Sequence, residues 1–102
     1  MKTLGTHNYY VYILTNKGKT VLYVGVTNNL MHRLRFHREN ANLHKKAFTS
    51  KYKCFYLIYY EHFSAINDAI TREKQIKGWL RIKKENLITG FNPDWQFLND
   101  EI

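Results

Sequence analysis

One acidic residue falls on the apolar side of a predicted helix. Residues 64–80 show helical periodicity, and the apolar positions fill an arc of about 120° on the helical wheel: Ile66, Ala69, Ile70, Ile76 and Leu80. Glu73 lies inside this arc, where removal of its carboxylate from water costs several kcal/mol. An i,i+4 pair with Lys77 would return only about 0.3–0.5 kcal/mol. We therefore expect Glu73 to point into a cleft between helix and sheet, with an edge-of-core ion pair to Lys77 as the alternative.

Two phenols are predicted to share one face of a β-hairpin. Residues 9–15 (YYVYILT) and 21–26 (VLYVGV) are aromatic and β-branched, as strands are, and a turn signal lies at 16–19. A loop centred in that turn places Tyr12 directly opposite Tyr23, with Cβ atoms about 5 Å apart. An ordinary aromatic pair in the core is the alternative interpretation.

The segment after the hairpin adds a guanidinium and an imidazole. Thr27, Asn28 and Asn29 are N-cap candidates for a helix over 30–38, on which Arg33 and His37 share a face. Together with the phenols and one acid, these groups suit phosphodiester chemistry. Mg²⁺ accepts one or two carboxylates plus water and phosphate oxygens, and a guanidinium grips a phosphate with two hydrogen bonds. A phenol of lowered pKa, or the imidazole, would take the proton of an attacking water.

The charge balance indicates a polyanionic partner. The chain has 102 residues and a formal net charge of +8, concentrated in two stretches at 33–53 and 72–84. This is typical of nucleic-acid binders, although a solvated basic surface is the alternative. An anionic membrane is a weaker option, because neither stretch has a wide apolar face. We expect phosphate contacts from five residues of these stretches: Arg35, Lys45, Lys46, Lys74 and Lys77.

Length and composition set the remaining bounds. The chain suits one domain, has no apolar run of about 18 residues that could span a bilayer, and lacks the pattern of a secretory signal. Its single cysteine, Cys54, excludes an internal disulfide, so we expect a reducing, cytoplasmic location.

The rest of the chain supplies a third strand and two more helices. Residues 54–60 (CFYLIYY) read as a central strand, Ser64 as the cap of the helix over 64–80, and Gly90 as the end of a helix over 82–89. A proline-centred turn at 91–95 should return aromatic side chains to the core. The order β-β-α-β-α-α predicts an α+β fold, a small antiparallel sheet packed by helices.

These residues resemble the GIY-YIG endonuclease superfamily, specifically its short stand-alone members, over about residues 9–97. Five blocks carry the resemblance in order: Tyr10-Val11-Tyr12, Tyr23-Val24-Gly25, residues 29–37 (NLMHRLRFH), 71–79 (TREKQIKGW) and 92–95 (NPDW). The chain departs from the pattern at Tyr10, which stands where the first signature triplet has Gly, and at the valines in the middle of both triplets.

The resemblance implies a three-stranded antiparallel sheet flanked by helices, within a single domain over residues 1–102. It also implies metal-dependent hydrolysis of DNA, with one Mg²⁺ or Mn²⁺ held by Glu73. The biological role would be DNA repair or processing, and RNA or single strands are alternative substrates. Without an added DNA-binding domain, we expect recognition of structure rather than sequence. The implied roles are Tyr12 and Tyr23 as water-activating and phosphate-contacting phenols, Arg33 as the phosphate ligand, His37 as the helical histidine, and Asn92 as the residue that closes the site.

Other chemistries fit less well. A two-metal nuclease needs clustered carboxylates, a zinc module needs spaced Cys and His ligands, and Cys54 opens an aromatic strand as a core residue would. The main alternative is a nucleic-acid-binding module that does not cut, or that acts only with a partner protein. Aromatic side chains beside basic ones could then stack on single-stranded bases.

Overall fold

A three-stranded antiparallel sheet separates two layers of helices in the computed structural model, which describes residues 7–39 and 51–102. The strand order is β2-β1-β3. The strands span Tyr9–Thr15 (β1), Leu22–Thr27 (β2) and Tyr56–Phe63 (β3). The antiparallel α+β architecture predicted from the element order is therefore confirmed.

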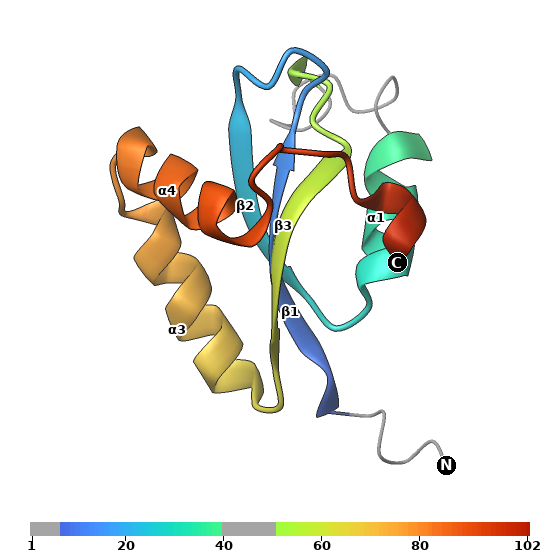
Figure 1. Cartoon of the computed structure of the whole chain (residues 1–102). Coiled ribbons are helices and arrows are strands. Elements are labelled where there is room, and N and C mark those ends of the chain that lie inside the picture. The colour runs from blue at the N-terminus through green and yellow to red at the C-terminus, as the bar shows by residue number, and fades with distance from the viewer. Residues whose placement is uncertain (1–6, 40–50) are drawn as a thin grey trace.

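The helices cover opposite faces of this sheet (Figure 1). Helices α3 (Ile66–Lys77) and α4 (Arg81–Phe91) pack on one face. Helix α1 (Leu30–Glu39) and the C-terminal 3-10 turn η2 (Asn99–Glu101) pack on the other. In the described part of the chain, no helix combines the length and apolar character that crossing a membrane requires.

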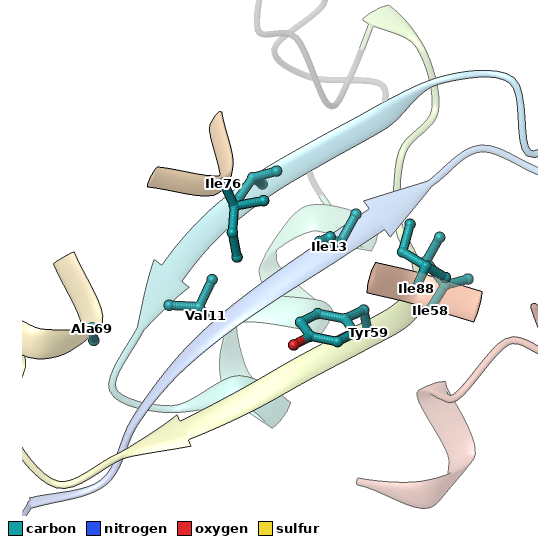
Figure 2. Close-up of a cluster of buried hydrophobic side chains, with 8 residues drawn as sticks. Val11, Ile13, Ile58, Tyr59, Ala69, Ile76 and Ile88 are labelled. Carbon is teal, nitrogen blue, oxygen red and sulfur yellow. The ribbon is translucent and has the colours of Figure 1, made fainter. Parts of the chain in front are cut away.

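Each face of the sheet buries its own hydrophobic cluster. The cluster under α3 and α4, drawn in Figure 2, contains Val11, Ile13, Val24, Ile58, Tyr59, Ala69, Ile76 and Ile88. The cluster under α1 contains Tyr12, Leu14, Leu30, Leu34, Cys54, Leu57 and Leu98. A register shift between Ile13 and Leu14 accommodates a β-bulge in β3, which turns the consecutive residues Ile58 and Tyr59 toward the same cluster.

The hairpin register differs from the prediction by two residues. Tyr12 pairs with Gly25, and Leu14 pairs with Tyr23. The predicted pairing of Tyr12 with Tyr23 was wrong, but a shift of two residues keeps every side chain on its face. Both phenols therefore lie on the α1 side, with ring centroids 6.3 Å apart.

The loop between the strands explains this shift, because it spans residues 16–21 and is wider than predicted. Oδ1 of Asn16 accepts hydrogen bonds from the backbone N–H groups of Thr20 and Val21 at 2.8 and 3.3 Å. Lys19 takes the left-handed conformation, with φ of 60°. The side chain of Asn16 thus organises the loop, a contact that turn propensities do not reveal.

The helix limits also correct the sequence analysis. Helix α3 ends at Lys77, and Leu80 is 79% exposed as the N-cap of α4 instead of filling the core. Ser64 does not cap α3, because its N-cap is Ala65 and makes no side-chain hydrogen bond. Helix α4 continues through Gly90 to Phe91. The third strand begins and ends later than predicted, at Tyr56–Phe63 instead of 54–60.

Candidate active site

The Tyr12 ring lies against the backbone of Gly25, its partner on the edge strand β2. A Cβ atom at Gly25 would lie 2.6 Å from both Cζ and Oη of Tyr12. Only a residue without a side chain leaves room for this ring. Gly25 is thus a site-forming residue whose role the sequence analysis missed, although glycine within a strand pattern is a known signal of close approach.

His37 of α1 reaches the same ring. Its Nε2 is 3.1 Å from the Tyr12 hydroxyl, in a buried hydrogen bond between residues far apart in the sequence. The rings of Tyr12 and Tyr23 both contact the imidazole edge to face, with centroids 6.1 and 5.7 Å away. The structure therefore brings the two phenols and His37 together, as predicted.

The start of α1 sets where His37 stands. Asn29 caps the helix, because its Oδ1 accepts a hydrogen bond from the N–H of His32 at 3.0 Å. The helix then buries Leu30, Leu34 and His37, one side of its surface. The imidazole therefore belongs to the buried stripe of the helix.

Burial determines the protonation of the Tyr12–His37 pair. Burial, followed by the charge of Arg33, lowers the pKa of His37 to about 4, so the imidazole is neutral at neutral pH. Burial is also the main cause that raises the pKa of Tyr12 well above its usual value. The expected phenol of lowered pKa is thus not Tyr12, which stays protonated because 1% of its surface meets solvent.

Arg33 supplies the positive charge beside this pair. Its guanidinium lies near enough to lower the pKa values of Tyr12 and His37, as a cation does to neighbouring groups. It stacks over the ring of Phe36 at 5.8 Å and makes no ion pair with any acid of the described residues. A partly buried guanidinium without a carboxylate is suited to bind a phosphate.

Glu73 approaches from α3, the helix that packs against β1 and β2. After burial and Tyr23, its carboxylate also raises the pKa of Tyr12, so the acid lies within electrostatic reach of the phenol. Its side chain is only 12% exposed, and Oε2 is 2.6 Å from Nζ of Lys77, itself 51% exposed. The ion pair with Lys77, the alternative interpretation, is thus present, and the opening of Glu73 into a cleft stays a prediction.

This carboxylate is chemically suited to a hard divalent cation. A positive group, the Lys77 ammonium, already contacts it, and carboxylate oxygen is the ligand that Mg²⁺ prefers. Within residues 7–39 and 51–102, no group of three or more His, Cys, Asp or Glu could hold a metal ion. Glu73 is the carboxylate that would hold a metal ion, and its role as a ligand stays a prediction.

Asn92 is not brought to these groups by any contact in the described residues. Its Nδ2 donates to the carbonyl oxygens of Ile58 and Gln96 at 3.1 and 2.9 Å, and its Oδ1 accepts from the Gln96 N–H at 3.1 Å. The buried amide thus ties the end of α4 to the bulge of β3. Its implied role in closing the site stays a prediction, and its contacts are those of a structural residue.

The basic residues divide into paired and unpaired groups. Arg72, Lys77 and Arg81 form ion pairs with Glu61, Glu73 and Glu85 respectively. Lys74 on α3 and Arg35 on α1 are exposed and make no ion pair with described residues. Lys45 and Lys46 lie outside the described residues. Ion pairs therefore neutralise part of the second basic stretch, two of them within a helix and one between α3 and β3.

The fold and these residues define a nuclease-type domain, and comparison with known proteins agrees. A family model described as the GIY-YIG catalytic domain matches residues 8–86, so the chain belongs to the GIY-YIG family. This membership implies a nuclease-type function on nucleic acid, and GIY-YIG nucleases generally depend on a divalent metal.

The chain is also similar to two UPF0213 proteins. One, from Bacillus pumilus (strain SAFR-032), is 33% identical over 79 residues, which cover 78% of this chain and 76% of that protein. The solution NMR structure of the other, from Bacillus halodurans, shares 29% identity at a TM-score of 0.50 and covers 80% of this chain and 83% of that one.

Proposed function

We propose that this protein is a Mg²⁺- or Mn²⁺-dependent endonuclease that hydrolyses DNA phosphodiester bonds during DNA repair or processing. The observation that carries this proposal is the buried hydrogen-bonded pair of Tyr12 and His37, with the charge of Glu73 on the opposite layer of helices within electrostatic reach of the phenol. Arg33 lies beside the same phenol. An acid, a guanidinium and phenols are the groups that a site for a metal-bridged phosphate needs.

Exposure separates the roles of the two phenols. Tyr12 is buried and bonded to His37, so it positions the imidazole and the neighbouring ring. Tyr23 is partly exposed and contacts both rings, so it is the phenol that meets the attacking water or the phosphate. Tyr23→Phe should lower turnover by about 10²-fold or more, in the range of a lost acid–base group.

Arg33 would bind the non-bridging oxygens of the scissile phosphate and offset charge that grows in the transition state. Glu73 would hold the metal ion, which when bound supplies Lewis-acid polarisation of the phosphate. Once the phosphate compensates the Arg33 charge, one of the two causes that depress the pKa of His37 is weakened. Substrate binding would thereby make the imidazole a better proton acceptor.

The exposed cations favour recognition of structure rather than sequence. Arg35 and Lys74 are exposed on α1 and α3, the helices that carry Arg33 and Glu73. Contacts of such side chains with phosphates fix position on a nucleic acid and carry no base information. We therefore infer that branches, flaps or single-stranded ends decide where the enzyme cuts.

The test uses purified protein on branched, flapped, single-stranded and fully paired DNA, in Mg²⁺, in Mn²⁺ and in EDTA. Cutting that requires the metal and disappears in Glu73→Gln supports the proposal. The matched control is Glu85→Gln, which breaks another i,i+4 ion pair, the one between Glu85 and Arg81 on α4, and should leave cutting intact. Salt-sensitive binding without cutting of any substrate would instead establish the non-catalytic binding module.

Arg33 is tested by separating turnover from binding. Arg33→Ala should lower kcat more than DNA affinity, because the guanidinium contact strengthens in the transition state. Arg35→Ala on the same helix is the comparison, and we expect it to lower affinity alone. An equal loss of turnover and affinity in Arg33→Ala would reduce Arg33 to a phosphate anchor.

A further inference from the structure

A pocket of about 420 Å³ adjoins the candidate active site on the α1 face of the sheet. Its volume is within the usual range of small-molecule pockets. Its wall combines two tyrosine rings and three amides with aliphatic side chains, and the lining residues are Asn8, Tyr10, Asn28, Asn29, Leu30, Met31, Tyr60 and Ile102. None of the six candidate catalytic residues is among them.

The strand register places this pocket next to Tyr12. Tyr10 precedes Tyr12 by two residues on β1 and faces the same side, about 6.8 Å along the strand. Tyr60 is the direct partner of Tyr12 on β3, where Cβ atoms of opposed residues are about 5 Å apart. The two aromatic walls of the pocket thus border Tyr12, the residue that is hydrogen-bonded to His37 in the candidate active site.

The rings are held in fixed orientations. Tyr10 makes T-shaped contacts with Tyr60 and His62, at centroid distances of 6.4 and 5.3 Å. Tyr60 is braced in turn by Phe91 at 5.3 Å. Because both tyrosines are only partly buried against the core, they offer a preformed aromatic surface at little cost in side-chain entropy.

An amide stands at the rim of this aromatic surface. Asn28 lines the pocket and is exposed, just before the N-cap of α1. A carboxamide offers both donors and an acceptor, which is the combination presented by the edges of nucleobases. No Lys, Arg, Asp or Glu is among the lining residues. The chemistry of the pocket is therefore suited to a planar, polar-edged and uncharged group.

We propose that the pocket binds the base of an unstacked nucleotide that flanks the cleaved phosphate, by stacking on Tyr10 and Tyr60 and hydrogen bonding to Asn28. The inference rests on the proposed function, since it takes the phosphate site beside Tyr12 to bind nucleic acid. The feature of the substrate that the site selects is a single-stranded nucleotide at the point of cutting. A base within a duplex is stacked on both faces and cannot enter.

The experiment measures binding in EDTA, where no cutting is required, at one fixed salt concentration. The probes are a DNA duplex with a short single-stranded flap, the same duplex with an abasic flap, and the duplex without a flap. A ribonucleotide flap forms a fourth probe and distinguishes RNA from DNA as the source of the base. The variants are Tyr10→Leu, which keeps apolar bulk without an aromatic face, and Asn28→Ala.

We expect the wild-type protein to bind the flap with bases about tenfold more tightly than the abasic flap, the effect of one stacked base. Tyr10→Leu should abolish that preference and leave affinity for the flapless duplex unchanged, and Asn28→Ala should reduce the preference. The matched controls are Tyr52→Leu and Asn86→Ala, at exposed positions outside the pocket, and they should retain the preference.

Equal affinity of the wild-type protein for the normal and abasic flaps would overturn the inference. So would a Tyr10→Leu variant that loses affinity equally for every probe. Neither result concerns metal-dependent cutting, which is measured separately. A protein that cuts without selecting a base refutes only this inference, and a protein that selects the base but never cuts refutes only the proposed endonuclease.

Discussion

Substitution of Gly25 by alanine tests the packing of the candidate site with one methyl group. The new Cβ would lie 2.6 Å from Cζ and Oη of Tyr12, whereas ordinary van der Waals contact begins at 3.4 Å. The Tyr12 ring would therefore have to shift by about 0.8 Å, the difference between these distances. The ring is buried, with 1% exposure, so its neighbours must move with it.

The cost follows from this displacement. Overpacking of a core typically costs about 1–3 kcal/mol. The 3.1 Å bond between Tyr12 and His37 would lengthen toward the limit of hydrogen bonding, at about 1 kcal/mol. Alanine restricts the backbone of the unfolded chain more than glycine does, and this stabilises the folded state by about 0.4–1 kcal/mol. We expect Gly25→Ala to lower the free energy of unfolding by about 2 kcal/mol, and to lower turnover by about 10²-fold.

Urea denaturation and a single-turnover cleavage assay measure these two effects. Gly90→Ala is the control, because a Cβ there meets nothing within 4 Å inside α4. It should raise stability by about 0.5–1 kcal/mol, as the removal of a helical glycine does. In a Tyr12→Leu background, which lacks the clashing atoms, Gly25→Ala should cost little. An equal cost in both backgrounds would refute the steric explanation.

Three further predictions concern individual side chains. The pKa of His37 is 6.5 in the unfolded chain and about 4 in the folded chain, so the free energy of unfolding should fall by about 3 kcal/mol as the pH drops from the higher to the lower of these values. Urea titrations at a series of pH values should show a weaker fall in His37→Gln. Lys77→Ala leaves the shielded Glu73 carboxylate without its cation, so the melting temperature should fall without metal and rise more with Mg²⁺ than in the wild-type protein; an identical Mg²⁺ response would contradict Glu73 as the metal ligand. Asn92→Ala removes three hydrogen bonds to the main chain and should cost about 2–3 kcal/mol of stability while activity per folded molecule is retained; lost activity at unchanged stability would make Asn92 catalytic.

Several elements could be predicted from local sequence. Aromatic and β-branched runs identified the strands, and Asn29 was among the predicted caps of α1, because these signals act over a few residues. The position of Glu73 on the apolar side of its helix also followed from periodicity. The shielding of its side chain, 12% exposed, agrees with that reasoning.

Contacts between distant segments could not be predicted from local sequence. The hairpin register depends on the side chain of Asn16 within the loop. The charges available to a nucleic acid depend on ion pairs such as Arg72 with Glu61, formed between a helix and a strand. Local propensities depend on neighbouring residues only, so they predict neither the loop contact of Asn16 nor the ion pair between helix and strand.

The amino-acid sequence by itself determined which chemical groups the protein contains, the order of its helices and strands, and the excess of positive charge. Only the tertiary structure decided that Tyr12 is buried against Gly25 and bonded to His37, which keeps its phenol protonated and leaves Tyr23 as the accessible one. The reason is physical: protonation and access depend on which distant atoms exclude water from a group, and that is settled when the two faces of the sheet are packed.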